Sequence, residues 1–229
     1  MAAPLSPEVL QALQALDTCS VSNAIEVLGE RLRNEGFTSP TIRRITAGKT
    51  SLVGHAVTAR IQCSQPPMIG GTFPDRTDWW NYVLTIPEPR IAVIEDADKK
   101  PGTGTFLGEI HANILMALGR VGGITNGVVR DIPAIEEMGF QLFAGGLAVS
   151  HAYAHIVDFG QPVAIAGLPI SPGDLLQADM HGVLCIPKAL AADIPEAVAK
   201  IRAHERRLID LCRSPEFSLE KLRHAVESW

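Results

Sequence analysis

Residues 90–131 read RIAVIEDADKKPGTGTFLGEIHANILMALGRVGGITNGVVRD, and three structural elements can be predicted within this stretch. The apolar run at 90–95 is typical of a buried strand, and the segment from Gly108 to about Leu118 is typical of a helix. The β-branched run at 122–129 predicts a second strand. A strand, a crossover helix and a second strand in this order predict an α/β fold.

Helices and strands are also predicted on both sides of this unit. Those upstream are a helix at 7–16 capped by Ser6, a helix through Leu28 capped by Ser20 or Ser22, a strand at 52–61 and a short helix at 75–84. Those downstream are a helix at 132–138, a strand at 140–143, an all-β region at 162–186 and helices at 187–213 and 218–228. Residues 65–74 are rich in glycine and proline and predict a loop or an excursion of the chain that contacts a partner. The pattern predicts one α/β domain over residues 1–229, with a mixed sheet and a long C-terminal helix.

Composition restricts the possible partners. The formal net charge is −5 and no large basic block is present, so we expect no nucleic-acid partner. The four cysteines are widely spaced without a Cys-x-x-Cys pair, which argues against a disulfide framework or a cysteine-based zinc site. The first residues lack the features of a signal peptide, and no apolar run approaches the ~20 residues of a membrane helix. We therefore expect a cytoplasmic protein that does not contact a membrane.

The first chemical feature is a glycine-rich loop that leads into a helix, TGTFLGEIH at 103–111. Such a turn exposes backbone N–H groups at the positive end of the helix, where a carboxylate or a phosphate can bind. Glycines alone also fit a plain strand-to-helix connection, so the motif by itself leaves both interpretations open.

The second feature is the charged pair Arg130-Asp131, which follows the predicted strand at 122–129. Ligands of α/β folds bind at the carboxyl ends of strands. Arginine offers a fork that matches a carboxylate or an enolate oxygen, and aspartate offers a hard oxygen suited to Mg²⁺ or Mn²⁺. An isolated pair of this kind is more often a local ion pair that caps a turn. The crossover helix changes this expectation, because it would return both residues beside Glu109 at the helix start.

The pattern Gly-Glu-x20-Arg-Asp at 108–131 resembles the RraA-like family, which includes divalent-metal-dependent aldolases of 4-hydroxy-4-methyl-2-oxoglutarate and 4-carboxy-4-hydroxy-2-oxoadipate. Three other segments support the resemblance, which spans roughly residues 10–210: CSVSNA at 19–24, LVGHAVT at 52–58 and SPGDLLQADMHGVLCIP at 171–187. The resemblance implies a swivelling β/β/α core assembled as homotrimers or hexamers. One departure is Asn126, where the family usually has Asp.

The resemblance also implies roles for individual residues. Asp131 would be the Mg²⁺ (or Mn²⁺) ligand, Arg130 would hold the 2-oxo acid, and Glu109 would act on protons through a water. The backbone amides from Gly108 through Ile110 to His111 would contact the substrate. A carboxylate from a neighbouring subunit's C-terminal helix contributes in some members, and Glu205 is the best match here.

These implications predict a lyase that cleaves 4-hydroxy-2-oxo acids to pyruvate and also decarboxylates oxaloacetate. The alternatives are a non-catalytic regulator of an RNase, which Glu109 argues against, and another 2-oxo acid lyase or hydratase on the same scaffold. His151, His155 and His181 match no zinc motif, so structural or surface roles are favoured. For Trp79 and Trp80, a core or subunit contact is favoured over a substrate contact.

Overall fold

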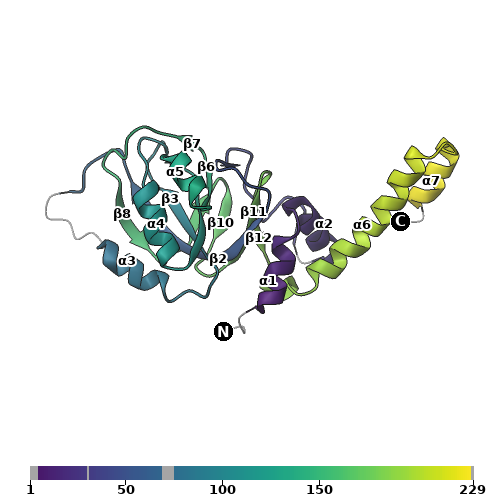
Figure 1. The fold of residues 1–229 in the computed structure, drawn as a ribbon, viewed down its shortest axis with the longest axis horizontal. Helices are drawn as coiled ribbons and strands as arrows, with labels where there is room; N and C mark the ends of the chain where they lie inside the picture. Colours follow the sequence, from purple (N-terminus) through teal and green to yellow (C-terminus); the bar gives the residue numbers. More distant parts are fainter. Residues whose placement is uncertain (1–4, 30, 69–74, 228–229) are drawn as a thin grey trace.

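The computed structural model describes residues 5–29, 31–68 and 75–227, and a mixed sheet of eight strands forms its centre (Figure 1). Seven strands follow the order β1 (Arg43–Arg44), β6 (Gln141–Ala144), β4 (Arg120–Thr125), β3 (Arg90–Asp96), β2 (Leu52–Gln62), β11 (Leu175–Asp179) and β12 (Gly182–Ile186). The eighth, β8 (His155–Phe159), pairs with the end of β2. The pairs from β2 through β3 and β4 to β6 are parallel and the others antiparallel. The predicted α/β fold with a mixed sheet is therefore confirmed.

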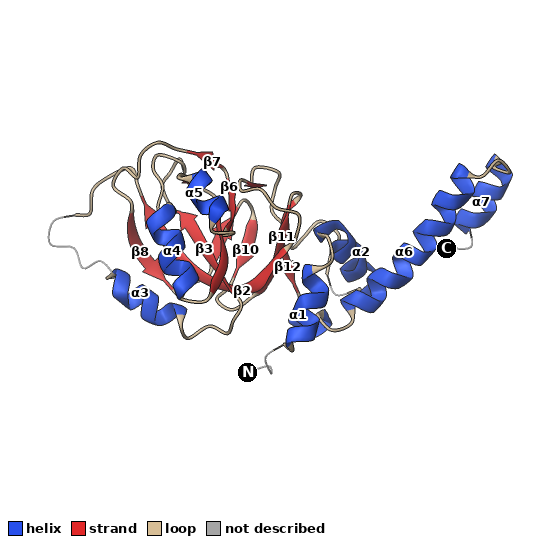
Figure 2. Cartoon of the chain, in the orientation of Figure 1, coloured by secondary structure: helices blue, strands red, loops and turns tan. Residues whose placement is uncertain are grey.

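Both faces of this sheet are covered (Figure 2). One face packs against α3 (Arg76–Val83), α4 (Glu109–Ala117) and α5 (Ile132–Glu137). The other face packs against the hairpin of β9 (Val163–Ile165) and β10 (Leu168–Ile170). Because side chains alternate along a strand, Ala92 and Ile94 of β3 lie in the first layer, while Ile91 and Val93 lie in the second. This two-sided burial explains the continuous apolar run of β3.

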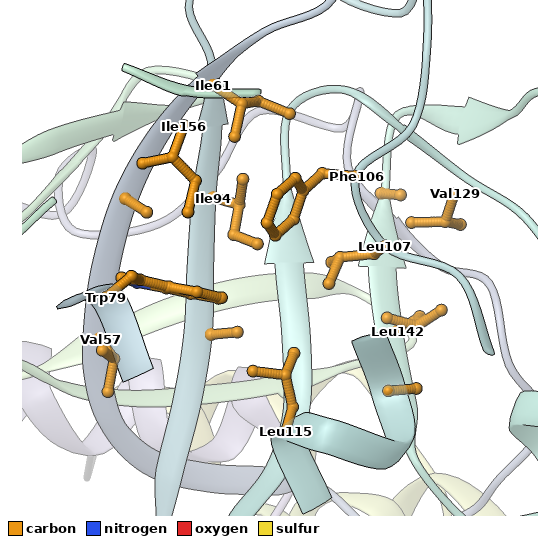
Figure 3. Packing of buried hydrophobic residues seen from close by; sticks show 14 of the residues in the cluster. Val57, Ile61, Trp79, Ile94, Phe106, Leu107, Leu115, Val129, Leu142 and Ile156 are labelled. Atoms are coloured by element: carbon orange, nitrogen blue, oxygen red, sulfur yellow. The ribbon is translucent and has the colours of Figure 1, made fainter. Parts of the chain in front are cut away.

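The helical side of the core holds Trp79, the largest fully buried side chain among the described residues (Figure 3). Trp79 of α3 is fully buried there, and its ring meets Phe106 edge-on, with 5.7 Å between the ring centroids. Phe106 and Leu107 belong to the same cluster and come from the loop that leads into α4. The loop that precedes the candidate site is therefore fixed by the core itself.

Three local predictions differ from the structure. Helix α2 (Thr18–Leu28) is capped by Asp17 and not by Ser20 or Ser22, because the Asp17 carboxylate accepts the Ser20 amide at 2.8 Å. The strand predicted at 122–129 is interrupted after Thr125, and its second part, β5 (Val128–Val129), pairs with β7 (Gly146–Leu147). The helix predicted at 187–213 begins as a 3₁₀ turn, η1 (Lys188–Leu190), and α6 spans only Ile194–Arg213.

The terminal helices lie at one end of the sheet. Helix α1 (Pro7–Gln14), which Ser6 caps as predicted, and α2 pack with the first part of α6 against β11 and β12. The rest of α6 and α7 (Leu219–Glu227) extend away from the body (Figure 1). Within the described ranges, no helix combines the length and the apolar character that crossing a membrane requires.

The buried side chain of His55 in β2 should make the stability of the fold depend on pH. Its side chain is buried, and its Nδ1 atom donates to the Gly173 carbonyl at 3.2 Å. Burial lowers the pKa of His55 below its ordinary value. As the pH falls below about 6.5, the unfolded chain therefore binds a proton before the folded chain does. The stability that neutral His55 supports is complete above this pH and is lost as the pH falls through the lowered folded-state pKa.

As the pH falls from about 7 to about 5, we expect the free energy of unfolding to decrease less in His55→Asn than in the wild type. The asparagine amide can still donate to the Gly173 carbonyl, but it does not titrate. Urea unfolding curves at several pH values measure the difference. Parallel pH profiles for the two proteins would show that His55 is not the group responsible.

Candidate functional site

The two predicted halves of the site meet where α4 begins. Leu107 forms an isolated parallel bridge with Val129, and the Arg130 amide donates to the Leu107 carbonyl at 3.3 Å. These backbone contacts hold the end of β5 beside the N-terminus of α4. The convergence predicted from the crossover is therefore present in the structure.

Asp131 caps α4 from outside the helix. Gly108 is the N-cap residue and has no side chain to offer, and Asp131 Oδ2 accepts the Glu109 amide at 3.1 Å. A Cβ atom on residue 108 would lie 2.6 Å from that oxygen, so the contact depends on glycine. The Glu109 amide is therefore already bound within the protein. A ligand carboxylate at the start of α4 would have to bind the backbone amides after Glu109.

Asp131 has an unusual backbone conformation, and its carboxylate forms an ion pair with Arg130. Asp131 has a φ of 60°, in the left-handed region that few residues other than glycine adopt. Arg130 Nε lies 3.4 Å from Asp131 Oδ2, so the local ion pair considered in the sequence analysis does form. The two side chains nevertheless remain 35% and 38% exposed, which leaves both accessible to a ligand.

A cavity of about 770 Å³ opens at this point. Its volume lies within the range of roughly 300–1,000 Å³ that is usual for small-molecule sites. Its lining includes Gly108, Glu109, Ile110, His111, Arg130 and Asp131. The structure therefore brings together in one cavity all the predicted site residues except Glu205.

Several lining residues were not predicted as site residues, and three of them have side chains with a ring that carries a polar atom. They are His151 and Tyr153, from the segment between β7 and β8, and His155, the first residue of β8. The sequence favours structural or surface roles for the two histidines. Their spacing carried no signal, because this segment is held at the cavity by contacts with Thr105 and Cys63, which are distant in sequence.

His111 connects the cavity with the core. Its imidazole stacks on Phe106, with 4.4 Å between the ring centroids, and Phe106 in turn meets Trp79. Figure 3 shows Trp79 and Phe106 on the same side of the sheet, within the buried cluster. The core contact predicted for Trp79 is therefore confirmed.

Comparison with known proteins agrees with this geometry. The family model described as RraA-like, Aldolase/RraA, matches residues 18–185. The chain belongs to the Aldolase/RraA family. A protein of Halalkalibacterium halodurans named "Putative 4-hydroxy-4-methyl-2-oxoglutarate aldolase" is 29% identical over 141 residues, which cover 59% of this chain and 67% of that protein.

Two solved structures share the fold. An uncharacterized protein from Pseudomonas syringae pv. tomato superimposes with a TM-score of 0.73 at 27% identity, over 99% of this chain and 96% of that chain. RraAS2 of Streptomyces coelicolor, described as an unusual member of the RNase ES inhibitor RraA protein family, gives a TM-score of 0.68 at 21% identity. That match covers 90% of this chain and 98% of that one. The resemblance stated from the sequence is thus confirmed at the level of family and fold.

Asn126, the departure from the usual Aldolase/RraA pattern, has a structural role. Its Oδ1 atom accepts the Asp96 amide at 2.7 Å, and its Nδ2 atom donates to the Asp96 carbonyl at 3.1 Å. An ionised aspartate could accept but not donate. Asn126 therefore joins the end of β3 to the turn after β4 by two hydrogen bonds, which fixes the strand edge next to the site.

A second group of candidate metal ligands lies outside the lining of this cavity. Cys63, Asp96 and Asp98 have ligand atoms within 4.8 Å of one another. Burial, followed by the charges of the two aspartates, raises the pKa of the Cys63 thiol to about 12, so the thiol stays protonated. All four carboxylate oxygens already accept hydrogen bonds, from Cys63, Ser64, Asp98 and Gly102. These hydrogen bonds give the group a structural role, which is to anchor the loop after β3.

Glu205 lies in the middle of α6, beyond the two buried residues of that helix. Within one chain it does not join the cavity lining. Only Ile194 and Val198 of α6 are buried, and no described residue of α7 is. The trimer or hexamer, and a contribution of Glu205 to a neighbour's site, stay predictions.

Proposed function

We propose that this protein is a divalent-metal-dependent lyase that releases pyruvate from 4-hydroxy-2-oxo acids and from oxaloacetate. The observation that carries the proposal is the convergence of Arg130, Asp131 and Glu109 in one cavity at the start of α4. The named aldolase among the relatives supports the same reaction class. Both substrate types share one requirement, which is stabilisation of a pyruvate enolate as a carbon–carbon bond breaks.

The ligand atoms at Asp131 fit Mg²⁺ or Mn²⁺. Only Oδ2 of this carboxylate accepts a hydrogen bond from the part of the chain that the structure describes, which leaves Oδ1 for a cation. Glu109 places a second carboxylate on the same cavity wall. Mg²⁺ typically binds one or two carboxylates and fills its remaining positions with water and substrate oxygens. When bound, such a cation would act as a Lewis acid on the 2-oxo group.

Residues of the chain would bind the substrate, stabilise the developing charge and transfer protons. Arg130 can donate to the carboxylate and to the oxygen on which negative charge develops, where a positioned cation stabilises the transition state. The helix N-terminus at Gly108 to His111 adds a favourable potential for the same anion. Glu109 can move protons through a water between the substrate and the solvent. Together these groups would hold the 2-oxo acid half of the substrate and receive its charge.

The test is an assay of pyruvate release, coupled to lactate dehydrogenase, with 4-hydroxy-4-methyl-2-oxoglutarate, 4-carboxy-4-hydroxy-2-oxoadipate and oxaloacetate. We expect turnover with Mg²⁺ or Mn²⁺, a loss of at least about 10²-fold after EDTA, and recovery when the metal is restored. Protein that releases no pyruvate from any of the three substrates with metal present would contradict the proposal.

A further inference from the structure

The second wall of the cavity is formed by the loop Ser150–His155, here called the histidine loop. It follows β7 and ends on His155, the first residue of β8, and it contributes His151, Tyr153 and His155 to the cavity that also holds Arg130 and Asp131. The proposed function assigns roles at the 2-oxo acid end of the substrate and leaves the histidine loop without one. The cavity therefore contains, besides His111, two imidazoles that have no role in the reaction described above.

The histidine loop is held in one conformation. The Ser150 carbonyl accepts the Thr105 amide at 3.2 Å, and the Tyr153 amide donates to the Cys63 carbonyl at 3.1 Å. Within the loop, the Ala154 amide donates to the His151 carbonyl at 3.0 Å. A Cβ atom on Gly104 would lie 2.7 Å from both the His151 carbonyl oxygen and the Ala152 Cβ, so the close approach depends on glycine. A side chain on such a fixed loop can be positioned for chemistry.

The backbone of the loop is strained at the cavity. Among the described residues, three non-glycine residues have positive φ: Asp131, Ala152 and Ala166. Ala166 lies with Gly167 in the two-residue turn between β9 and β10, a type of turn that requires positive φ. The other two, Asp131 and Ala152, both line the cavity. Strain of this kind persists where the surrounding structure imposes it, and it is common at catalytic sites.

The ring of His151 has a defined tautomer. Its Nδ1 atom lies 2.9 Å from the Ala152 carbonyl, which can only accept, so Nδ1 carries the hydrogen. In the neutral ring, Nε2 then holds the lone pair and can take a proton. The side chain is exposed and lines the cavity, so this nitrogen is open to a substrate.

We propose that His151 is the catalytic base that removes the proton from the 4-hydroxyl group of the substrate. This inference rests on the proposed function. His151 Nε2 takes the hydroxyl proton as the C3–C4 bond breaks, and the C4 oxygen becomes a carbonyl. The electron pair of the broken bond forms the enolate of pyruvate, whose oxygen lies beside Arg130. The enolate then takes a proton at C3 from a water held by Glu109, and the imidazolium returns its proton to the solvent.

Oxaloacetate provides the test, because its decarboxylation forms the same enolate without removing a hydroxyl proton. In His151→Asn the side-chain amide can still donate to the Ala152 carbonyl but offers no basic nitrogen. We expect the kcat for cleavage of the 4-hydroxy acid, divided by the kcat for decarboxylation, to fall by about 10²-fold or more. Both values are measured on the full-length protein with saturating Mg²⁺, and a thermal melt confirms folding.

His155→Asn is the matched control. Its Nδ1 atom also lies near a loop carbonyl, that of Tyr153, at 2.8 Å. General loosening of the histidine loop would affect both activities, so the ratio in this variant should stay within about threefold of the wild type. An unchanged ratio in His151→Asn, or a larger fall in His155→Asn, would overturn the inference. Absence of both activities in the wild type would instead overturn the proposed function.

Discussion

Asp131→Asn should release pyruvate from every substrate far more slowly than the wild type and should need much more Mg²⁺ for the activity that remains. The substitution removes the negative charge but keeps an oxygen that can accept the Glu109 amide, so the cap of α4 survives. Mutating residues that only support metal ligands typically weakens metal binding by roughly 10–100-fold. Loss of the ligand itself should therefore raise the half-saturating Mg²⁺ concentration by at least about 10²-fold.

A Mg²⁺ titration of the pyruvate-coupled rate measures this effect, with Glu137→Gln as the control. Glu137 is an exposed residue of α5, the helix that Asp131 precedes, and it does not line the cavity. The control also removes one negative charge but should leave the titration unchanged. If Asp131→Asn kept the metal dependence of the wild type, Asp131 would not be the metal ligand.

The fold could be predicted from residues 90–131 because the pattern there is local. A buried strand, a helix and a second strand fix the crossover, and the crossover fixes the position of Arg130 relative to Glu109. The same reasoning failed at α2, where three polar residues compete for one cap. Asp17 prevails because its carboxylate also accepts from Ser20 Oγ and from Arg202 of α6, a partner that a local pattern does not contain.

The histidine loop could not be predicted for a related reason. Its backbone partners, Thr105 and Cys63, lie far from it in the sequence, and their contacts depend on the packing of β8 beside β2. Ala152 is a small residue in a conformation that its type does not indicate. The part of the cavity wall that the histidine loop forms thus depends on long-range packing. The part with the charged residues follows from the order of strand, helix and strand along the chain.

We expect Trp79→Ala to cause the largest loss of stability, because the core around the cavity depends on the packing of this side chain. The Trp79 ring is fully buried between α3 and the sheet, and it supports Phe106, on which His111 stacks. Truncating a buried tryptophan removes both its burial and its contacts, at a cost of about 3–5 kcal/mol. Urea unfolding, monitored by far-UV circular dichroism, should show a fall of this size in the free energy of unfolding.

Trp80→Ala is the control for Trp79→Ala. Both variants exchange tryptophan for alanine at adjacent positions of α3, so they share the same change in helix propensity and differ in how much buried surface is lost. Trp80 is only partly buried, so its truncation should cost less, on the order of 1–2 kcal/mol. Because Phe106 lines the cavity, Trp79→Ala should also lower pyruvate release at temperatures where the protein is still folded, whereas Trp80→Ala should not. Equal losses of stability in the two variants would mean that the core does not depend on Trp79 as its burial indicates.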